Sequence, residues 1–116
     1  MVMTRHIIVP SVDPGTPATL SYALTTTLLR NELGFEGVVI TDGLEMVGAG
    51  SLSDGEKAVR CVLAGADLLL GLTDLSGTVS ALEYAVQTGR ITMAQLDAAV
   101  TRILRLKVEH GIIPMP

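Results

Sequence analysis

The sequence predicts an α/β domain in which helices cover a parallel sheet of three strands. Three short apolar segments, 6–9, 37–42 and 66–72, alternate with segments in which apolar residues recur at helical spacing. Such apolar runs suit strands that are buried on both faces, and their alternation with helices favours right-handed parallel connections. The chain has 116 residues, which is enough for one domain, so a single domain is expected over 1–116.

The first half of the chain supplies two of these strands and one helix. A β-branched run at His6–Val9 stops at Pro10 and indicates the first strand. The stretch 11–19 is rich in Pro, Gly, Ser and Thr and is expected to be a loop. A helix is expected over 21–34, because its first residue is a serine that can cap it and leucines follow at helical spacing. The second strand follows over 37–42.

The second half continues the alternation. An S-x-x-E capping box at 53–56 starts a helix that ends at Gly65, and the third strand is expected over 66–72. Two further helices are expected at 76–88 and at 93–110, and the second of them begins at another capping box, T-x-x-Q. The apolar face expected for the helix after the first box comprises Ala58, Val59, Val62 and Leu63.

A parallel sheet of only three strands leaves two long, apolar and uncharged outer strands without partners. Edges of this kind favour pairing with another chain unless something covers them. The sequence therefore predicts either that the chain pairs with another copy or that it is a piece of a larger fold.

Composition and charge exclude several classes of function. Twelve acidic against eight basic side chains give a net charge of −4, which disfavours nucleic acid and anionic membrane surfaces as partners. Cys61 is the only cysteine, and His6 and His110 lie at opposite ends of the chain, so no metal site is expected. No nucleotide-binding loop is recognisable, and no cofactor is expected. The start of the chain does not resemble a signal peptide, so a cytoplasmic location is expected.

Asp42 is the residue best placed for chemistry. It ends a largely apolar run at the C-terminal end of an expected parallel strand, where α/β folds place their active sites. A carboxylate at this position can act as a nucleophile, a general base or a metal ligand. It can also cap backbone amides without any catalytic role, and position alone favours that use.

Other polar residues near the expected strand ends are weaker candidates. Glu45 could belong to the carboxylate pair of a glycosidase, although a solvated loop glutamate is the commoner case. Asp13 and Asp74 occupy strand-to-helix loops, where turns and caps are the usual roles. Asp67 lies at the start of the third strand and is expected to be structural. His6 opens the first strand, and a lone histidine there is more often a hydrogen-bonded core residue than a catalyst.

Two stretches resemble glycoside hydrolase family 3. The stretch 28–46, LLRNELGFEGVVITDGLEM, resembles the region around the catalytic strand of that family, and 64–70, AGADLLL, resembles the strand that follows. The T-D-x-L-E-M pattern at 41–46 is most similar to the β-N-acetylhexosaminidase branch. The β-glucosidase branch more often has an aromatic residue at the position of Gly43.

The resemblance implies a retaining glycosidase with a (β/α)8-like barrel. The matching nucleophile is Asp42, which would attack the anomeric carbon of a β-linked N-acetylhexosamine glycan, in cell-wall sugar recycling, and form a covalent glycosyl-enzyme. Residues 3–6 are similar to the sixth strand of the family, and this alignment points His6 toward the same pocket as a substrate-binding residue. Arg5 departs from the small residue usual at its position. The resemblance implies no metal and no cofactor.

The first five strands of the family have no counterpart here. Its K-H-F-P-G-H-G-like segment, and the histidine–aspartate pair that serves as general acid and base, are also without a match. A whole barrel takes about 250 residues, so the resemblance implies a partial parallel (β/α) TIM-type barrel, three strands in sequence order with flanking helices.

Three hypotheses about function follow. In the first, the chain is a hydrolase segment that carries the nucleophile, is unstable or self-associates alone, and needs complementation by a missing N-terminal barrel part for activity. In the second, it is an inactive remnant that acts at most as an association module. An unrelated small α/β binding module is the third.

Overall fold

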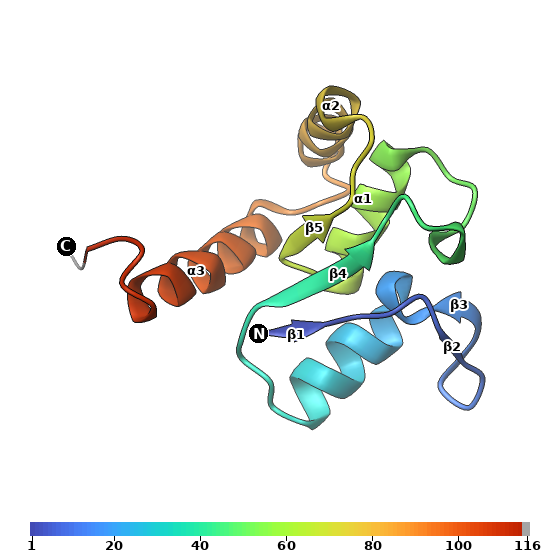
Figure 1. The fold of residues 1–116 in the computed structure, drawn as a ribbon, viewed down its shortest axis with the longest axis horizontal. Helices are drawn as coiled ribbons and strands as arrows, with labels where there is room; N and C mark the ends of the chain where they lie inside the picture. Colours follow the sequence, from blue (N-terminus) through green and yellow to red (C-terminus); the bar gives the residue numbers. More distant parts are fainter. Residues whose placement is uncertain (115–116) are drawn as a thin grey trace.

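The computed structural model describes residues 1–114 and has a parallel sheet of three strands at its centre (Figure 1). These strands are β1 (Val2–Met3), β4 (Val39–Gly43) and β5 (Leu68–Leu70). Both neighbouring pairs run parallel, and the order β1–β4–β5 along the sheet is the order along the sequence. The predicted parallel sheet with helices around it is confirmed.

The first strand of this sheet lies earlier than predicted. The sequence predicted it at 6–9, but the segment that pairs with β4 is β1. Two backbone N–H groups fix this pairing, those of Val2 and Thr4, each 2.9 Å from the carbonyl oxygen of Val38 and Ile40 respectively.

The predicted first strand instead forms part of a small hairpin. Residues Ile8–Val9 make up β2, which pairs antiparallel with β3 (Asp13–Pro17), so the loop predicted over 11–19 is partly extended. Ile7 and Ile8 are 56% and 50% exposed. A β-branched run indicates extended backbone but does not identify its partner. Here the partner lies close in the chain, where closing the connecting loop costs little entropy.

The predicted helices are confirmed with shifted ends. The first of them is η2 (Ala23–Glu32), which is wound more widely than an α-helix and begins beyond Ser21, whose hydroxyl accepts a hydrogen bond from Leu24 N–H. At the next helix the hydroxyl of Ser53 accepts from Glu56 N–H, which is one half of the predicted capping box, while the Glu56 carboxylate binds Arg60 and Arg90. The remaining helical elements are η1 (Ala18–Leu20), η3 (Val47–Ala49), α1 (Asp54–Ala64), α2 (Leu75–Gln87) and α3 (Met93–Glu109).

The core lies between the sheet and α1, with a second cluster between α1 and α2. In Figure 1, α3 extends away from the sheet on the side of β5, and η2 lies below β1 and β4. Leu44, at the end of β4, is fully buried in the main cluster. The other buried members of that cluster are Val39, Ala49, Cys61 and Ala66. The second cluster contains Val59, Ala85 and Ile91.

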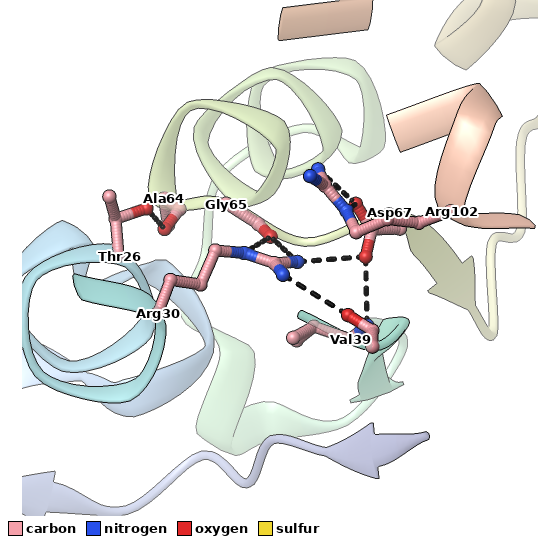
Figure 2. Close-up of polar contacts among 8 residues, drawn as sticks. Thr26, Arg30, Val39, Ala64, Gly65, Asp67 and Arg102 are labelled. Carbon is pink, nitrogen blue, oxygen red and sulfur yellow. Dashed lines mark hydrogen bonds and ion pairs between the residues drawn. The ribbon is translucent and has the colours of Figure 1, made fainter. Parts of the chain in front are cut away.

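Asp67 joins three elements at the N-terminal end of the sheet (Figure 2). Its side chain is completely buried and forms ion pairs with Arg30 on η2 at 2.8 Å and with Arg102 on α3 at 2.7 Å. One carboxylate oxygen also accepts a hydrogen bond from Val39 N–H at 2.8 Å. Asp67 is therefore structural, as predicted, and it fixes the position at which β4 begins.

Candidate active site

The candidate site lies at the C-terminal end of β4, the middle strand of the sheet. Asp42 is half-buried there, and its Oδ1 accepts a hydrogen bond from Gly43 N–H at 2.9 Å. The C-terminal ends of parallel strands meet at one edge of a sheet, so residues that follow β1 and β5 lie near this carboxylate. The structure thus places Asp42 where the sequence predicted it, at the edge that carries chemistry in α/β folds.

Residues on both sides of Asp42 are bonded to β5. Thr41 is fully buried, and its hydroxyl accepts a hydrogen bond from Leu70 N–H at 3.0 Å. Two residues after Asp42, Leu44 N–H donates to the carbonyl oxygen of Leu70 at 2.9 Å. The pairing of β4 with β5 shifts register between these two contacts. The Thr41 hydroxyl supplies a hydrogen bond at the irregular part of the strand pairing. Asp42 therefore lies between two residues, Thr41 and Leu44, that are both hydrogen-bonded to Leu70.

His6 reaches the same edge from the segment that follows β1. Its Nε2 lies 2.8 Å from the carbonyl oxygen of Gly43, and because a carbonyl only accepts, Nε2 carries the proton. The other ring nitrogen, Nδ1, is buried without a hydrogen-bond partner among residues 1–114. Gly48 leaves room for this ring, since a Cβ at that position would lie 2.8 Å from the His6 Cβ. The structure therefore brings His6 to Gly43, the residue that follows Asp42.

Glu45 also belongs to this edge, whereas the other predicted candidates do not. The Glu45 side chain is exposed and lies against Gly71, where an added Cβ would overlap its carboxylate. Asp13 accepts a hydrogen bond of 2.6 Å from the Ser21 hydroxyl, and Asp74 caps α2 by accepting from Gly77 N–H at 2.9 Å. The capping role predicted for Asp74 is confirmed, whereas Asp13 begins β3 and its carboxylate binds the Ser21 hydroxyl rather than the backbone of a turn.

Lys57 is a residue of this region that the sequence did not single out. It lies on α1, is only 7% exposed, and its Nζ donates to the carbonyl oxygen of Leu44 at 2.8 Å. A lysine in a capped amphipathic helix is ordinarily expected on the protein surface. The available signal was its spacing, because Lys57 precedes Cys61 and Ala64 by four and seven residues and so shares their helix face.

Two further titratable groups nearby, Cys61 and Asp54, have shifted pKa values that reflect burial and hydrogen bonding within the fold. Desolvation raises the pKa of the Cys61 thiol to about 12, so Cys61 is not a nucleophile at neutral pH. Hydrogen bonds from Thr73 and Asp74 lower the pKa of Asp54, which joins the start of α1 to the loop after β5. Within residues 1–114, no three His, Cys, Asp or Glu side chains come together as metal ligands. No helix in that range is long and apolar enough to cross a membrane.

Comparison with known proteins assigns the chain to a family. Residues 1–106 match the model of the glycosyl hydrolase family 3 N-terminal domain. A β-N-acetylglucosaminidase/β-glucosidase from Cellulomonas fimi is 35% identical over 96% of this chain, and the β-hexosaminidase LpqI of Mycobacterium tuberculosis is 33% identical over 91%. These matches span 22% and 29% of the two relatives.

Solved structures agree with the sequence matches. A glycoside hydrolase family 3 β-N-acetylglucosaminidase from Paenibacillus sp. FPU-7 superposes with a TM-score of 0.90 at 41% identity and covers 98% of this chain. The structure of M. tuberculosis LpqI superposes with a TM-score of 0.85 at 31% identity, over the same share of the chain. This chain corresponds to 23% and 34% of those two structures, so it spans about a third or less of each. The chain belongs to glycosyl hydrolase family 3 and matches its N-terminal domain.

Proposed function

We propose that this chain carries the nucleophile of a retaining β-N-acetylglucosaminidase, and that Asp42 is that nucleophile. The observation that carries the proposal is the position of the Asp42 carboxylate, half-buried at the C-terminal end of the middle strand of a parallel sheet. The names of the relatives, β-N-acetylglucosaminidase and β-hexosaminidase, support the substrate class.

Asp42 acts in two displacement steps. Its ionised Oδ2 attacks the anomeric carbon of a β-linked N-acetylhexosamine, while a second group protonates the leaving oxygen, and a covalent glycosyl-enzyme forms. Oδ1 is held by Gly43 N–H, which orients the carboxylate. Water then attacks the same carbon, the second group takes its proton, and Asp42 leaves as a carboxylate.

The second group comes from outside the described residues. A retaining enzyme needs this acid and base about 5 to 5.5 Å from the nucleophile in the usual arrangement of two carboxylates. Asp13 accepts from the Ser21 hydroxyl, Asp74 caps α2, and Glu45 lies exposed over Gly71. The isolated chain is therefore expected to hydrolyse these glycans negligibly.

The substrate contact of His6 stays a prediction. Its Nε2–H already donates a hydrogen bond to the carbonyl oxygen of Gly43, and its Nδ1 is buried. A direct hydrogen bond from His6 to a sugar hydroxyl therefore requires the ring to turn when substrate binds.

The sheet is proposed to be part of a (β/α)8-like barrel. Its three parallel strands follow sequence order, as consecutive strands of such a barrel do. The outer strands are partly uncovered, since Met3 on β1 is 51% exposed and Leu70 on β5 is 44% exposed. A groove of about 590 Å³ beside β5 is lined mainly by apolar side chains of α1, α2 and α3, including Val62, Leu82 and Ile103. An N-terminal barrel part, in this or another polypeptide, would cover these surfaces.

The same exposed surfaces favour a second candidate function. A chain whose apolar strand edges remain open can act as an association module without catalysis. Self-association and complementation use the same edges of β1 and β5, so a binding measurement alone does not separate the two functions. An activity measurement separates them, because only the complemented enzyme turns over substrate.

The test compares three samples with a nitrophenyl β-N-acetylglucosaminide. They are the chain alone, the chain supplemented with the first five strands of a barrel from the same family, and the supplemented Asp42→Asn variant. Turnover that appears only on supplementation and disappears in Asp42→Asn supports the proposal. Robust turnover by the chain alone contradicts the need for complementation, and no turnover in any sample leaves the association module as the better proposal.

The role of Asp42 as nucleophile has its own readout. A supplemented Asp42→Ala variant should regain turnover with azide and release the glycosyl azide of inverted configuration, because azide occupies the position of the missing carboxylate. A product of retained configuration would contradict a nucleophilic Asp42.

A further inference from the structure

A buried lysine lies beneath the turn that carries Asp42. Lys57 is 7% exposed, and the described residues give its ammonium one hydrogen bond, 2.8 Å to the carbonyl oxygen of Leu44. Its neighbours on the same helix face, Cys61 and Ala64, are buried. Among residues 1–114 no carboxylate forms an ion pair with it. Burying an ammonium in this way is unfavourable, and a methionine would fill the same space without that cost.

The carbonyl that Lys57 binds belongs to the turn immediately after the candidate nucleophile. β4 ends at Gly43, so the Leu44 carbonyl lies past the strand and needs another donor. The N–H of Leu44 is bonded to β5, and the Gly43 carbonyl receives hydrogen bonds from His6 Nε2 and from Met46 N–H. The peptide groups 43–44 and 44–45 are thus held from the segment after β1, from β5 and from α1 together.

Beyond this turn the chain runs over the surface before it returns to the core at Ala49. Residues 45–48 are exposed, and Gly48 and Gly50 make the segment before α1 conformationally permissive. Lys57 reaches across from α1 and fixes the turn before that segment begins. A charged donor suits this use, because its hydrogen bond to a carbonyl is stronger than a neutral one and its long stem spans the gap between helix and strand end.

We propose that Lys57 is a positioning residue for Asp42: its ammonium holds the Leu44 carbonyl and thereby fixes the orientation of the Asp42 carboxylate toward the anomeric carbon. The proposal rests on the proposed nucleophilic role of Asp42. Lys57 touches neither substrate nor the reacting atoms, and it acts through the peptide groups 43 and 44. Small displacements of a reacting group cost about 10²-fold in rate, so loss of this contact should appear in kcat.

The experiment uses the supplemented enzyme described above and compares Lys57→Met, Lys57→Arg and Arg60→Met. Methionine keeps the length and removes the donor, arginine keeps a charged donor, and Arg60 is the matched control because it lies on the same helix with a half-exposed side chain. Lys57→Met should lower kcat about 30- to 100-fold and change KM less than about 3-fold, because the contact orients the nucleophile rather than binding the sugar. Lys57→Arg should recover most of the lost kcat, and Arg60→Met should behave like the parent.

A second readout does not depend on turnover. Hydrogen exchange of the amides of Leu44 and Met46 should accelerate in Lys57→Met while the amides of α1 keep their protection. Unchanged kcat and exchange in a folded Lys57→Met variant would overturn the proposal, as would an increase in KM alone or uniform acceleration of exchange throughout α1. Should Lys57→Met not fold, the same comparison is made with Lys57→Gln, whose shorter amide does not reach Leu44, and the same outcomes decide.

The activity of the supplemented parent distinguishes failure of the proposed function from failure of the positioning role of Lys57. If the supplemented parent is inactive, or is active but insensitive to Asp42→Asn, the nucleophile assignment fails whatever Lys57 does. If the parent depends on Asp42 and Lys57→Met leaves kcat and exchange unchanged, only the positioning role fails.

Discussion

The backbone N–H of Val39 donates a 2.8 Å hydrogen bond to the buried carboxylate of Asp67, at the start of the strand that ends with Asp42. Arg30 and Arg102 complete the environment of that carboxylate, so η2 and α3 are both bonded to one buried side chain (Figure 2). The strand that presents the candidate nucleophile is fixed at its beginning by this cluster and at its end by contacts from His6 and Lys57.

Replacing Asp67 by asparagine should destabilise the supplemented protein by about 3–5 kcal/mol, because two partly buried guanidinium groups would lose their counter-charge. Arg30 and Arg102 are 12% and 24% exposed in their side chains, so water compensates little. Urea unfolding measures the difference. Glu56→Gln is the control, since it breaks ion pairs that are partly exposed and should cost about 1 kcal/mol or less. Equal costs for the two variants would contradict a dominant role for the Asp67 cluster.

The isolated chain should self-associate through the edge of β5. Leu70 is 44% exposed there, and an uncharged open edge pairs with other chains. Leu70→Lys should therefore shift the protein toward monomer in sedimentation velocity, because a charge at an edge opposes pairing. Leu75→Lys, at the exposed start of α2, is the control and should leave the distribution unchanged. A sharp monomer peak for the parent, together with a cooperative melt, is the result that would count against this prediction.

Cys61 should report whether the core has formed. Burial raises the pKa of its thiol to about 12, and the positive charge of Lys57 offsets only part of this effect. Alkylation by iodoacetamide at pH 8 should therefore be slow in the supplemented protein and should reach the rate of a free thiol in urea. Fast alkylation of the supplemented protein without urea would show that the core around α1 is open.

The helices, the parallel order of the strands and the structural aspartates could be predicted because each depends on local pattern. Ser53 and Asp74 have side chains that match backbone donors a few residues away, so their capping role is visible in sequence. The third strand follows a helix that ends at Gly65, whose φ of 110° suits glycine. The position of Asp42 at a strand end follows from the apolar run before it.

What could not be predicted depends on contacts between distant segments. The first strand was placed at 6–9, because nothing local says that Val2 pairs with Val39. The buried face of α1 also differs from the expected one. Val62 and Leu63 are expected inside but are only half-buried, while Lys57 is buried. From its charge alone Lys57 is expected on the surface, and its hydrogen bond to the Leu44 carbonyl, a contact between distant segments, accounts for its burial.

Acid should weaken one surface link between α1 and the loop before α3. Hydrogen bonds from Arg90 and then Arg60 lower the pKa of Glu56 from 4.5 to about 2. Because the folded-state pKa is depressed, the stabilisation is complete above pH 4.5 and is lost as the pH falls toward 2. The parent should therefore lose more stability than Glu56→Gln over that interval, measured by urea unfolding at fixed ionic strength. Since Glu56 is partly exposed, the difference should shrink in 1 M salt. A pH dependence identical in the two proteins contradicts the link.

Gly48→Ala should disturb the site through His6. A Cβ at this position would lie 2.8 Å from the His6 Cβ, and the loop resists moving outward because its next residue, Ala49, is fully buried. We expect the ring to leave the Gly43 carbonyl and kcat of the supplemented enzyme to fall about 10-fold. The chain has two histidines, so the imidazole signals of His6 in a proton–nitrogen spectrum can be assigned by comparison with a His110→Gln variant.

The exposed Ser51 of the same loop provides the control, and Ser51→Ala should change neither kcat nor the imidazole signals. A double-mutant cycle then tests the route of the effect. In a His6→Gly background, which lacks the opposing Cβ, Gly48→Ala should cost little further activity, because the two substitutions act through the same contact. If Gly48→Ala lowers kcat equally in both backgrounds, the loop acts on the site by a path other than His6. If, in the parent background, Gly48→Ala neither lowers kcat nor shifts the imidazole signals of His6, the close packing of Gly48 on His6 does not constrain the strand end that carries Asp42.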